Sequence, residues 1–243
     1  MSLPDAKALY ATIEATWPAA SVSELGPFTI RDGQGGGKRV SAATCNGPYS
    51  TDAIEAAEDA MRILGQTPMF QIREGDEALD ADLAKRGYDI IDPVTMYAAD
   101  VQDIATELPP RTAAIQAWEP LHIMREIWLA GGIGPERVDV MMRASSPKTG
   151  FVSRWQDKPA GASFAAIHDG IAMVHAIEIV PFQRRLGVAR WLMRRAAYWT
   201  IANGGHTLAV ICTTENIGAN ALYASLGMTV VGQYHYRILP ETT

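Results

Sequence analysis

The sequence has little cysteine, no long apolar run and no excess of positive charge, and each absence excludes a class of protein. Two cysteines among 243 residues are too few for a disulfide framework. Neither Cys45 nor Cys212 belongs to a metal-ligand spacing such as C-x-x-C, so we expect two free thiols and no metal site. No stretch approaches twenty apolar residues, which argues against a membrane-spanning helix.

The N-terminal residues and the net charge indicate the expected location and the expected partners. Residues 1–5 lack the basic start and apolar core of a secretory signal, so a cytoplasmic location is expected. The formal net charge of −6 argues against a general nucleic-acid binder. Apolar residues make up 48% and charged residues 20%, as in an ordinary globular protein, and the length allows one large domain or two small ones. We expect neither a nucleic-acid nor a membrane partner, and a homodimer is left open.

The most informative stretch runs from residue 172 to residue 205. Met173–Val180 is rich in β-branched residues and is ended by Pro181, which predicts a largely buried strand. After Gly187, apolar residues recur every three to four positions until Asn203, which predicts an amphipathic helix. A turn that carries arginine and glycine joins the predicted strand to the predicted helix.

That turn, residues 183–189, predicts an anion site. Gly187 and Ala189 are small enough to let a ligand approach the main chain, and the first amides of the helix have no partner within it. The helix dipole adds partial positive charge, and Arg184 and Arg185 add two full charges. Five arginines crowd one end of the predicted helix: Arg184, Arg185, Arg190, Arg194 and Arg195. An ordinary turn with solvated arginines is the alternative.

A second motif follows downstream, where residues 216–228 have the pattern N-x-x-A-x-x-L-Y-x-x-x-G-hydrophobic. Together the two motifs resemble those of the GNAT superfamily of acyl-CoA-dependent N-acyltransferases, and the resemblance covers roughly residues 112–239. It implies an α/β fold with a mixed, mainly antiparallel twisted sheet flanked by helices. The predicted order of elements, one strand, two helices, three strands, helix, strand, helix and strand, is the order of that family.

The resemblance also implies cofactor-binding residues for acetyl-CoA. In the family, a loop matched here by Arg184, Gly187 and Ala189 binds the diphosphate of coenzyme A through main-chain amides, and the preceding strand pairs with the pantetheine arm. The later Asn and Tyr, matched by Asn216 and Tyr223, lie along the cofactor. The expected cofactor-binding residues are Ile177, Glu178, Ile179, Arg184, Arg185, Leu186, Gly187, Val188, Ala189, Asn216 and Tyr223.

Two residues are expected to be catalytic. Tyr223 is the expected proton donor to the departing thiol, with a packing role as the alternative. His175 is the first choice for the base, because it resembles a histidine of the arylalkylamine N-acetyltransferases and has a suitable pKa. A purely structural His175 is equally open. A common pattern of the family has a glutamate where this chain has Met173, which argues against a direct glutamate mechanism at that position. Glu178 is an alternative base, but strand alternation is expected to put it on the face opposite His175, so that both cannot face one pocket.

The N-terminal half repeats part of this pattern. Residues 79–91 follow the order helix, glycine and strand, and matching Gly87 with Gly227 puts Leu83 at the place of Tyr223. We therefore expect residues 1–105 to form a degenerate GNAT-like or accessory unit and residues 106–243 to form the catalytic domain, with a linker at residues 100–111. A chance likeness is the alternative. The glycine run at residues 33–37 lacks the strand and Lys-Ser/Thr helix of a phosphate loop.

The expected function is transfer of an acetyl group from acetyl-CoA to a primary amine of a small molecule or peptide. Two alternatives stand beside it. One is a coenzyme A-binding regulatory or interaction domain with little catalytic activity, and the other is an interaction scaffold that uses only the fold.

Overall fold

The chain forms two sheets with helices on both faces of the larger one, and the computed structural model describes residues 3–240. The strands are β1 (Ser21–Leu25), β2 (Phe28–Asp32), β3 (Thr44–Cys45), β4 (Met69–Ile72), β5 (Asp89–Asp100), β6 (Ile115–Ala117), β7 (Lys148–Trp155), β8 (Lys158–His168), β9 (Ile171–Ile179), β10 (Thr207–Thr213) and β11 (Thr229–Ile238). The helices are α1 (Ala6–Thr16), α2 (Thr51–Ile63), α3 (Glu77–Lys85), α4 (Val101–Ile104), α5 (His122–Ala130), α6 (Pro135–Arg143), α7 (Val188–Ala202) and α8 (Ile217–Ser225), with 3-10 turns η1 (Lys38–Val40) and η2 (Pro181–Gln183).

The larger sheet has eight strands in the order β4-β11-β5-β10-β9-β8-β7-β6, and the smaller has the order β1-β2-β3. From β6 onward the elements follow the order predicted from the sequence. Side chains of α7 pack with Phe151 and Val174 on one face of the large sheet, whereas Trp128 of α5 and Met141 of α6 pack with Phe164 on the other face. The central strands β8 and β9 are therefore covered on both faces, as their apolar sequences require.

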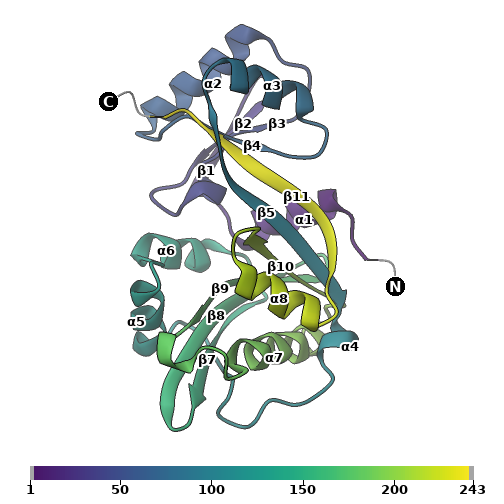
Figure 1. Cartoon of the computed structure of the whole chain (residues 1–243). Coiled ribbons are helices and arrows are strands. Elements are labelled where there is room, and N and C mark those ends of the chain that lie inside the picture. Colours follow the sequence, from purple (N-terminus) through teal and green to yellow (C-terminus); the bar gives the residue numbers. More distant parts are fainter. Residues whose placement is uncertain (1–2, 241–243) are drawn as a thin grey trace.

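The two halves of the chain exchange strands. β5, from the N-terminal half, pairs antiparallel with β10, with Asp100 opposite Thr207 and Val94 opposite Thr213. β11, at the C-terminal end, pairs antiparallel with β5 and also with β4. Figure 1 shows β5 and β11 running side by side from the N-terminal elements to the C-terminal ones. The two halves therefore share one sheet and one continuous set of backbone hydrogen bonds.

The helix–glycine–strand likeness seen in the sequence is real in space. Gly87 ends α3 with φ +86°, and Gly227 ends α8 with φ +78°. The next amide donates to an equivalent carbonyl in each case, Tyr88 N to Leu83 O and Met228 N to Tyr223 O, both at 3.1 Å. Leu83 thus occupies the place of Tyr223, as the sequence comparison predicted.

One local prediction was wrong, and two local features were not predicted. The segment predicted as a linker at residues 100–111 begins with helix α4, whose Val101 is buried. The continuation of β5 through Pro93 was not predicted, and it is tolerated because Pro93 lies beside a register shift on β11, where its missing N–H costs no ladder hydrogen bond. The hairpin of β1 and β2 around Gly26 was not predicted.

The division at residues 105 and 106 stays a prediction. Within residues 3–240, no helix has the length and apolar character needed to cross a membrane.

Candidate functional site

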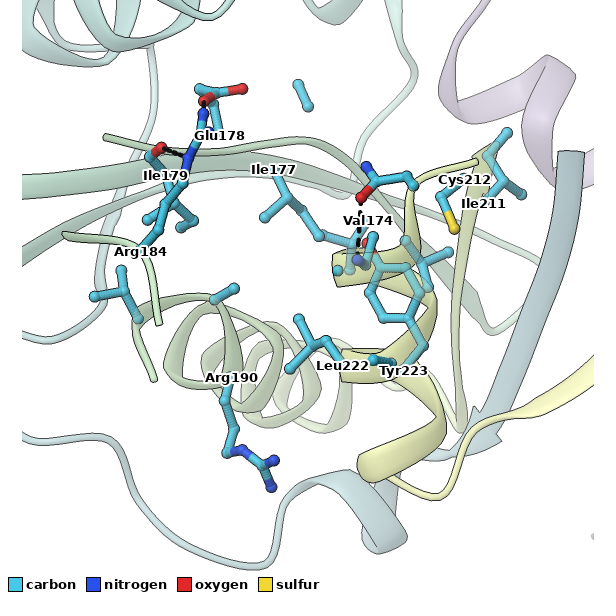
Figure 2. Close-up of a pocket in the computed structure, with 18 of the residues that line it drawn as sticks. Val174, Ile177, Glu178, Ile179, Arg184, Arg190, Ile211, Cys212, Leu222 and Tyr223 are labelled. Atoms are coloured by element: carbon cyan, nitrogen blue, oxygen red, sulfur yellow. Dashed lines mark hydrogen bonds and ion pairs between the residues drawn. The ribbon is translucent and has the colours of Figure 1, made fainter. Parts of the chain in front are cut away.

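The site is an opening between two parallel strands. β9 and β10 pair only as far as Val174 opposite Val210, although β9 continues to Ile179 and β10 to Thr213. The far edge of β9 remains paired with β8, where Gly161 lies opposite Ile179. A cavity of about 1040 Å³ occupies the opening, and Figure 2 shows side chains of β9, β10, α7 and α8 around it. Main-chain groups of β9 beyond Val174 therefore face the cavity without a strand partner.

A β-bulge decides which side chains of β9 face which way. Ala176 has φ +50°, and three steps along β9 from His175 to Glu178 match two steps along β8 from Phe164 to Ala162. The extra residue puts His175 and Glu178 on the same face, the one covered by α5 and α6. The expectation that they lie on opposite faces was wrong, because simple alternation does not hold across a bulge.

The turn before α7 has the geometry of an anion site. Gly187 is the N-cap with φ +82°, and no side chain caps the helix there. Trp191 N donates to Gly187 O and is the first amide of α7 to form a hydrogen bond within the helix. The amides that precede it therefore have no partner within the helix. A Cβ built on Gly187 would meet no atom within 4 Å. Arg185, Gly187, Val188 and Ala189 line the cavity, whereas Leu186 does not and is 41% exposed.

A buried glutamine anchors this turn. Gln183 is 2% exposed, and its Nε2 donates to Trp155 O of β7 at 3.2 Å. Its Oε1 has no hydrogen-bond partner within residues 3–240, and the residue lines the cavity. Gln183 was not predicted as a site residue, because a polar residue in a turn gives no sign of burial.

The arginines of this region do not form one cluster. Arg184 folds back onto β9, where Nε donates to Ile179 O at 3.0 Å and Nη2 contacts Glu178 Oε1 at 3.2 Å (Figure 2). Arg190 lines the cavity and donates to Ser225 Oγ. Arg194 pairs with Glu107, and Arg195 donates to Ala114 O. The two last arginines tie the connection before β6 to α7 and lie outside the cavity lining.

Tyr223 reaches the cavity from α8. Its side chain is buried, and its ring packs against that of Tyr97 with centroids 5.5 Å apart. Burial raises the pKa of the Tyr223 phenol, and the nearby Cys212 and Tyr97 raise it further. Figure 2 shows the ring projecting between α8 and the strands. Within residues 3–240 its hydroxyl makes no hydrogen bond in the structure, so it is free for a ligand.

Asn220 organises the surroundings of Tyr223, and the sequence analysis did not single it out. Its Nδ2 donates to the carbonyl oxygens of Thr213, Thr214 and Asn216, which joins α8 to the end of β10. Its Oδ1 accepts from the Tyr97 hydroxyl at 2.8 Å. Asn216 caps α8 by accepting from Ala219 N at 3.1 Å and lines the cavity. The motif asparagine thus sets the start of the helix, and Asn220 fixes its position.

His175 is buried and hydrogen-bonded at both ring nitrogens. Arg39 Nη1 lies 3.0 Å from Nδ1, and Thr16 Oγ1 lies 2.9 Å from Nε2. Because a guanidinium only donates, Nδ1 must accept, and Nε2–H donates to Thr16, whose own hydroxyl donates to Thr12 O. Burial lowers the pKa of His175 well below its usual value, and the charge of Arg39 lowers it further. The imidazole is neutral, and neither nitrogen has a free lone pair.

Both cysteines are free thiols, as expected, and Cys212 lines the cavity. Burial raises the pKa of the Cys212 thiol to about 11, so the thiol stays protonated near neutral pH. Across residues 3–240, no group of three or more His, Cys, Asp and Glu side chains is arranged to hold a metal ion.

The cavity fits a thioester cofactor with a phosphorylated end. Open amides and Gly187 stand at one end, an unpaired strand edge runs along the middle, and the phenol of Tyr223 stands at the other. Residues 117–228 match the Acetyltransferase (GNAT) family, so the chain contains a GNAT acetyltransferase domain in this range. Acetyl-CoA is the acyl donor that this family uses.

Relatives of nearly the same length support this assignment. The chain is 23% identical over 236 residues to the uncharacterized N-acetyltransferase YobR of Bacillus subtilis (strain 168), covering 92% of this chain and 94% of that protein. A GCN5-related N-acetyltransferase from Kribbella flavida matches with a TM-score of 0.69 at 15% identity, over 99% of this chain and 98% of that one. A tandem GNAT protein from the clavulanic acid biosynthesis pathway matches with a TM-score of 0.61 at 13% identity, over 83% and 76%. At these identities, the structural matches show a shared fold, including the tandem arrangement.

Proposed function

We propose that the protein is an acetyl-CoA-dependent N-acetyltransferase that acts on a primary amine of a small molecule or peptide. One observation carries the proposal. The open edge of β9 leads from the unpaired amides of α7 to the hydroxyl of Tyr223 within a single cavity. An anion-binding end and a proton-donating end are thus joined by a surface that can form backbone hydrogen bonds.

Main-chain and arginine groups of the cavity are proposed to bind acetyl-CoA, the acyl donor. The first amides of α7, with Arg185 beside them, would hold the diphosphate of coenzyme A. Main-chain groups of Ile177 and Ile179 would pair with the amides of the pantetheine arm, as an added strand would. When bound, acetyl-CoA supplies an activated acetyl group and a thiol leaving group. Arg184 supports the site indirectly, since it fastens the end of β9 to the turn.

Tyr223 is the proposed proton donor. Its raised pKa keeps the phenol protonated at neutral pH, so a proton is available when a thiolate leaves. The Tyr97 ring and the Asn220 network hold the Tyr223 side chain in place. The same shift leaves almost no phenolate at neutral pH, and the phenolate is the form that would act as a base, so the acid role is the one proposed.

The base is proposed to be Glu178 rather than His175. An amine is mostly protonated at neutral pH and must lose a proton before it attacks. His175 has both nitrogens engaged, whereas Glu178 has one oxygen bonded to Arg184 and reaches toward Gly131 in the loop after α5. In the family this part of the fold forms the acceptor wall, which supports the proposal that Glu178 accepts the proton directly or through water.

Thiol release from acetyl-CoA, measured across a panel of primary amines, tests the proposal. We expect release that depends on the amine and falls sharply in the Tyr223→Phe variant. Coenzyme A binding by calorimetry serves as the parallel readout. Tight coenzyme A binding with no amine-dependent thiol release would contradict the proposed activity and favour a regulatory coenzyme A-binding domain.

A further inference from the structure

The cavity wall includes one cation contributed by the N-terminal half, outside the matched GNAT domain. Arg39 lies in η1 and lines the same cavity as His175 and Tyr223. The diphosphate is assigned to the open amides of α7 and to Arg185, so Arg39 is not needed for it. Its position next to His175 puts it on the α5 and α6 face of β9, which is the face of Glu178.

Arg39 has a fixed position but no acidic partner. Nη1 donates to Nδ1 of His175, and the guanidinium lies over the Trp17 ring, 5.4 Å from its centroid. Within residues 3–240 no carboxylate forms an ion pair with Arg39. The two acidic groups of nearby segments already have partners, since Glu14 pairs with Arg31 and Asp92 pairs with Lys38.

The neighbours of this half-buried guanidinium, His175, Trp17 and Tyr234, are all neutral, so none of them offsets its charge. Arginine has five N–H donors in a planar fork that matches a carboxylate, and the His175 bond uses only one of them. The same charge repels an acceptor whose only charge is its ammonium group.

We propose that Arg39 binds a carboxylate of the acceptor, so that the acceptor is an amine that also carries a carboxylate, such as an amino acid. This inference rests on the proposed acetyltransferase function and names its substrate class. His175 acts as a positioning residue, because its neutral tautomer accepts from Arg39 and holds the guanidinium toward the cavity. Glu178 lies about 7 Å further along the same face, two strand steps away, where it can receive the amine proton.

Matched pairs of amino acids and their carboxamides test this substrate class in the full chain. The carboxamide has the less basic amine, so it is the better nucleophile near neutral pH, and a preference for the acid must come from binding. We expect the acids to bind the coenzyme A-loaded protein roughly tenfold or more tightly by calorimetry, and to show the lower KM in thiol release. In Arg39→Gln we expect this preference to disappear because the KM for the acid rises, with a smaller change in kcat and unchanged coenzyme A affinity.

Two further variants separate charge from structure. Arg39→Lys keeps a charge in a different shape and should retain part of the preference, whereas Arg194→Gln removes a charge outside the cavity and should retain all of it. Thermal unfolding of each variant checks that it folds. Carboxamides that bind as tightly as acids, or an acid preference that survives in Arg39→Gln, would overturn the inference. Amine-dependent thiol release without that preference would leave the proposed function standing, whereas its absence for every amine would refute the function itself.

Discussion

The ring of Tyr97, on strand β5 of the N-terminal half, packs 5.5 Å from the ring of Tyr223 in the C-terminal domain. The hydroxyl of Tyr97 donates to Asn220, whose side chain in turn joins α8 to β10. The exchanged strand β5 therefore forms one wall behind the proposed proton donor. The N-terminal half, although it lacks an equivalent of Tyr223, is part of the site.

Removing the hydroxyl of Tyr223 should impair chemistry more than binding. We expect Tyr223→Phe to lower kcat by roughly tenfold or more with little change in coenzyme A affinity, because the ring packing stays and only the proton donor is lost. Steady-state kinetics and calorimetry measure the two effects. Because burial raises the pKa of Tyr223, the wild type should show no loss of rate through deprotonation of this phenol as the pH rises from neutral to about 9.

The matched control is Tyr97→Phe, which removes a hydroxyl from the neighbouring ring. The lost bond to Asn220 should reduce the free energy of unfolding by about 1 kcal/mol, measured by denaturant unfolding. The effect on kcat should be much smaller than that of Tyr223→Phe. Equal losses of kcat in both variants would show that the hydroxyl of Tyr223 has no special role.

Exchanging the carboxylate of Glu178 tests the proposed base. We expect Glu178→Gln to lower kcat/KM for the amine by roughly a hundredfold, and His175→Gln to lower it far less, because glutamine can both accept from Arg39 and donate to Thr16. Since Glu178 also holds Arg184, coenzyme A affinity is measured in parallel. A larger loss of kcat/KM in His175→Gln than in Glu178→Gln would return the base role to His175.

The sequence predicted the order of elements from β6 onward and the glycine turn before α7, because both depend on local signals. Glycine at a positive φ, a proline stop and apolar periodicity are visible in neighbouring residues. The exchange of β5 and β11 was not predictable, since any apolar strand can pair with several others. The bulge at Ala176 has no sequence signal, and it reversed the expected relation of His175 and Glu178. Arg39 was missed because its role depends on contacts with residues far along the chain.

Acid should destabilise the protein partly through His175. Its folded-state pKa lies below that of the unfolded chain, so at a pH between the two values the unfolded state binds more protons and stability rises with pH. The contribution is complete above about pH 6.5 and is lost as the pH falls toward the folded-state pKa, by at most about 1.4 kcal/mol per pH unit. Denaturant unfolding from pH 7 to pH 5 should show a shallower loss in His175→Gln than in the wild type. Identical slopes would mean that His175 is not buried as a neutral imidazole.

Calorimetric titration of coenzyme A into the wild type, Gly187→Ala and Gly87→Ala tests the central claim, that the turn before α7 binds the diphosphate. Both glycines have φ above +80° and open space where a Cβ would stand, so the backbone strain is similar, about 1 to 2 kcal/mol. Only Gly187 lines the cavity. We expect coenzyme A affinity to fall roughly tenfold or more in Gly187→Ala and to stay at the wild-type value in Gly87→Ala. Wild-type affinity in Gly187→Ala would contradict the account.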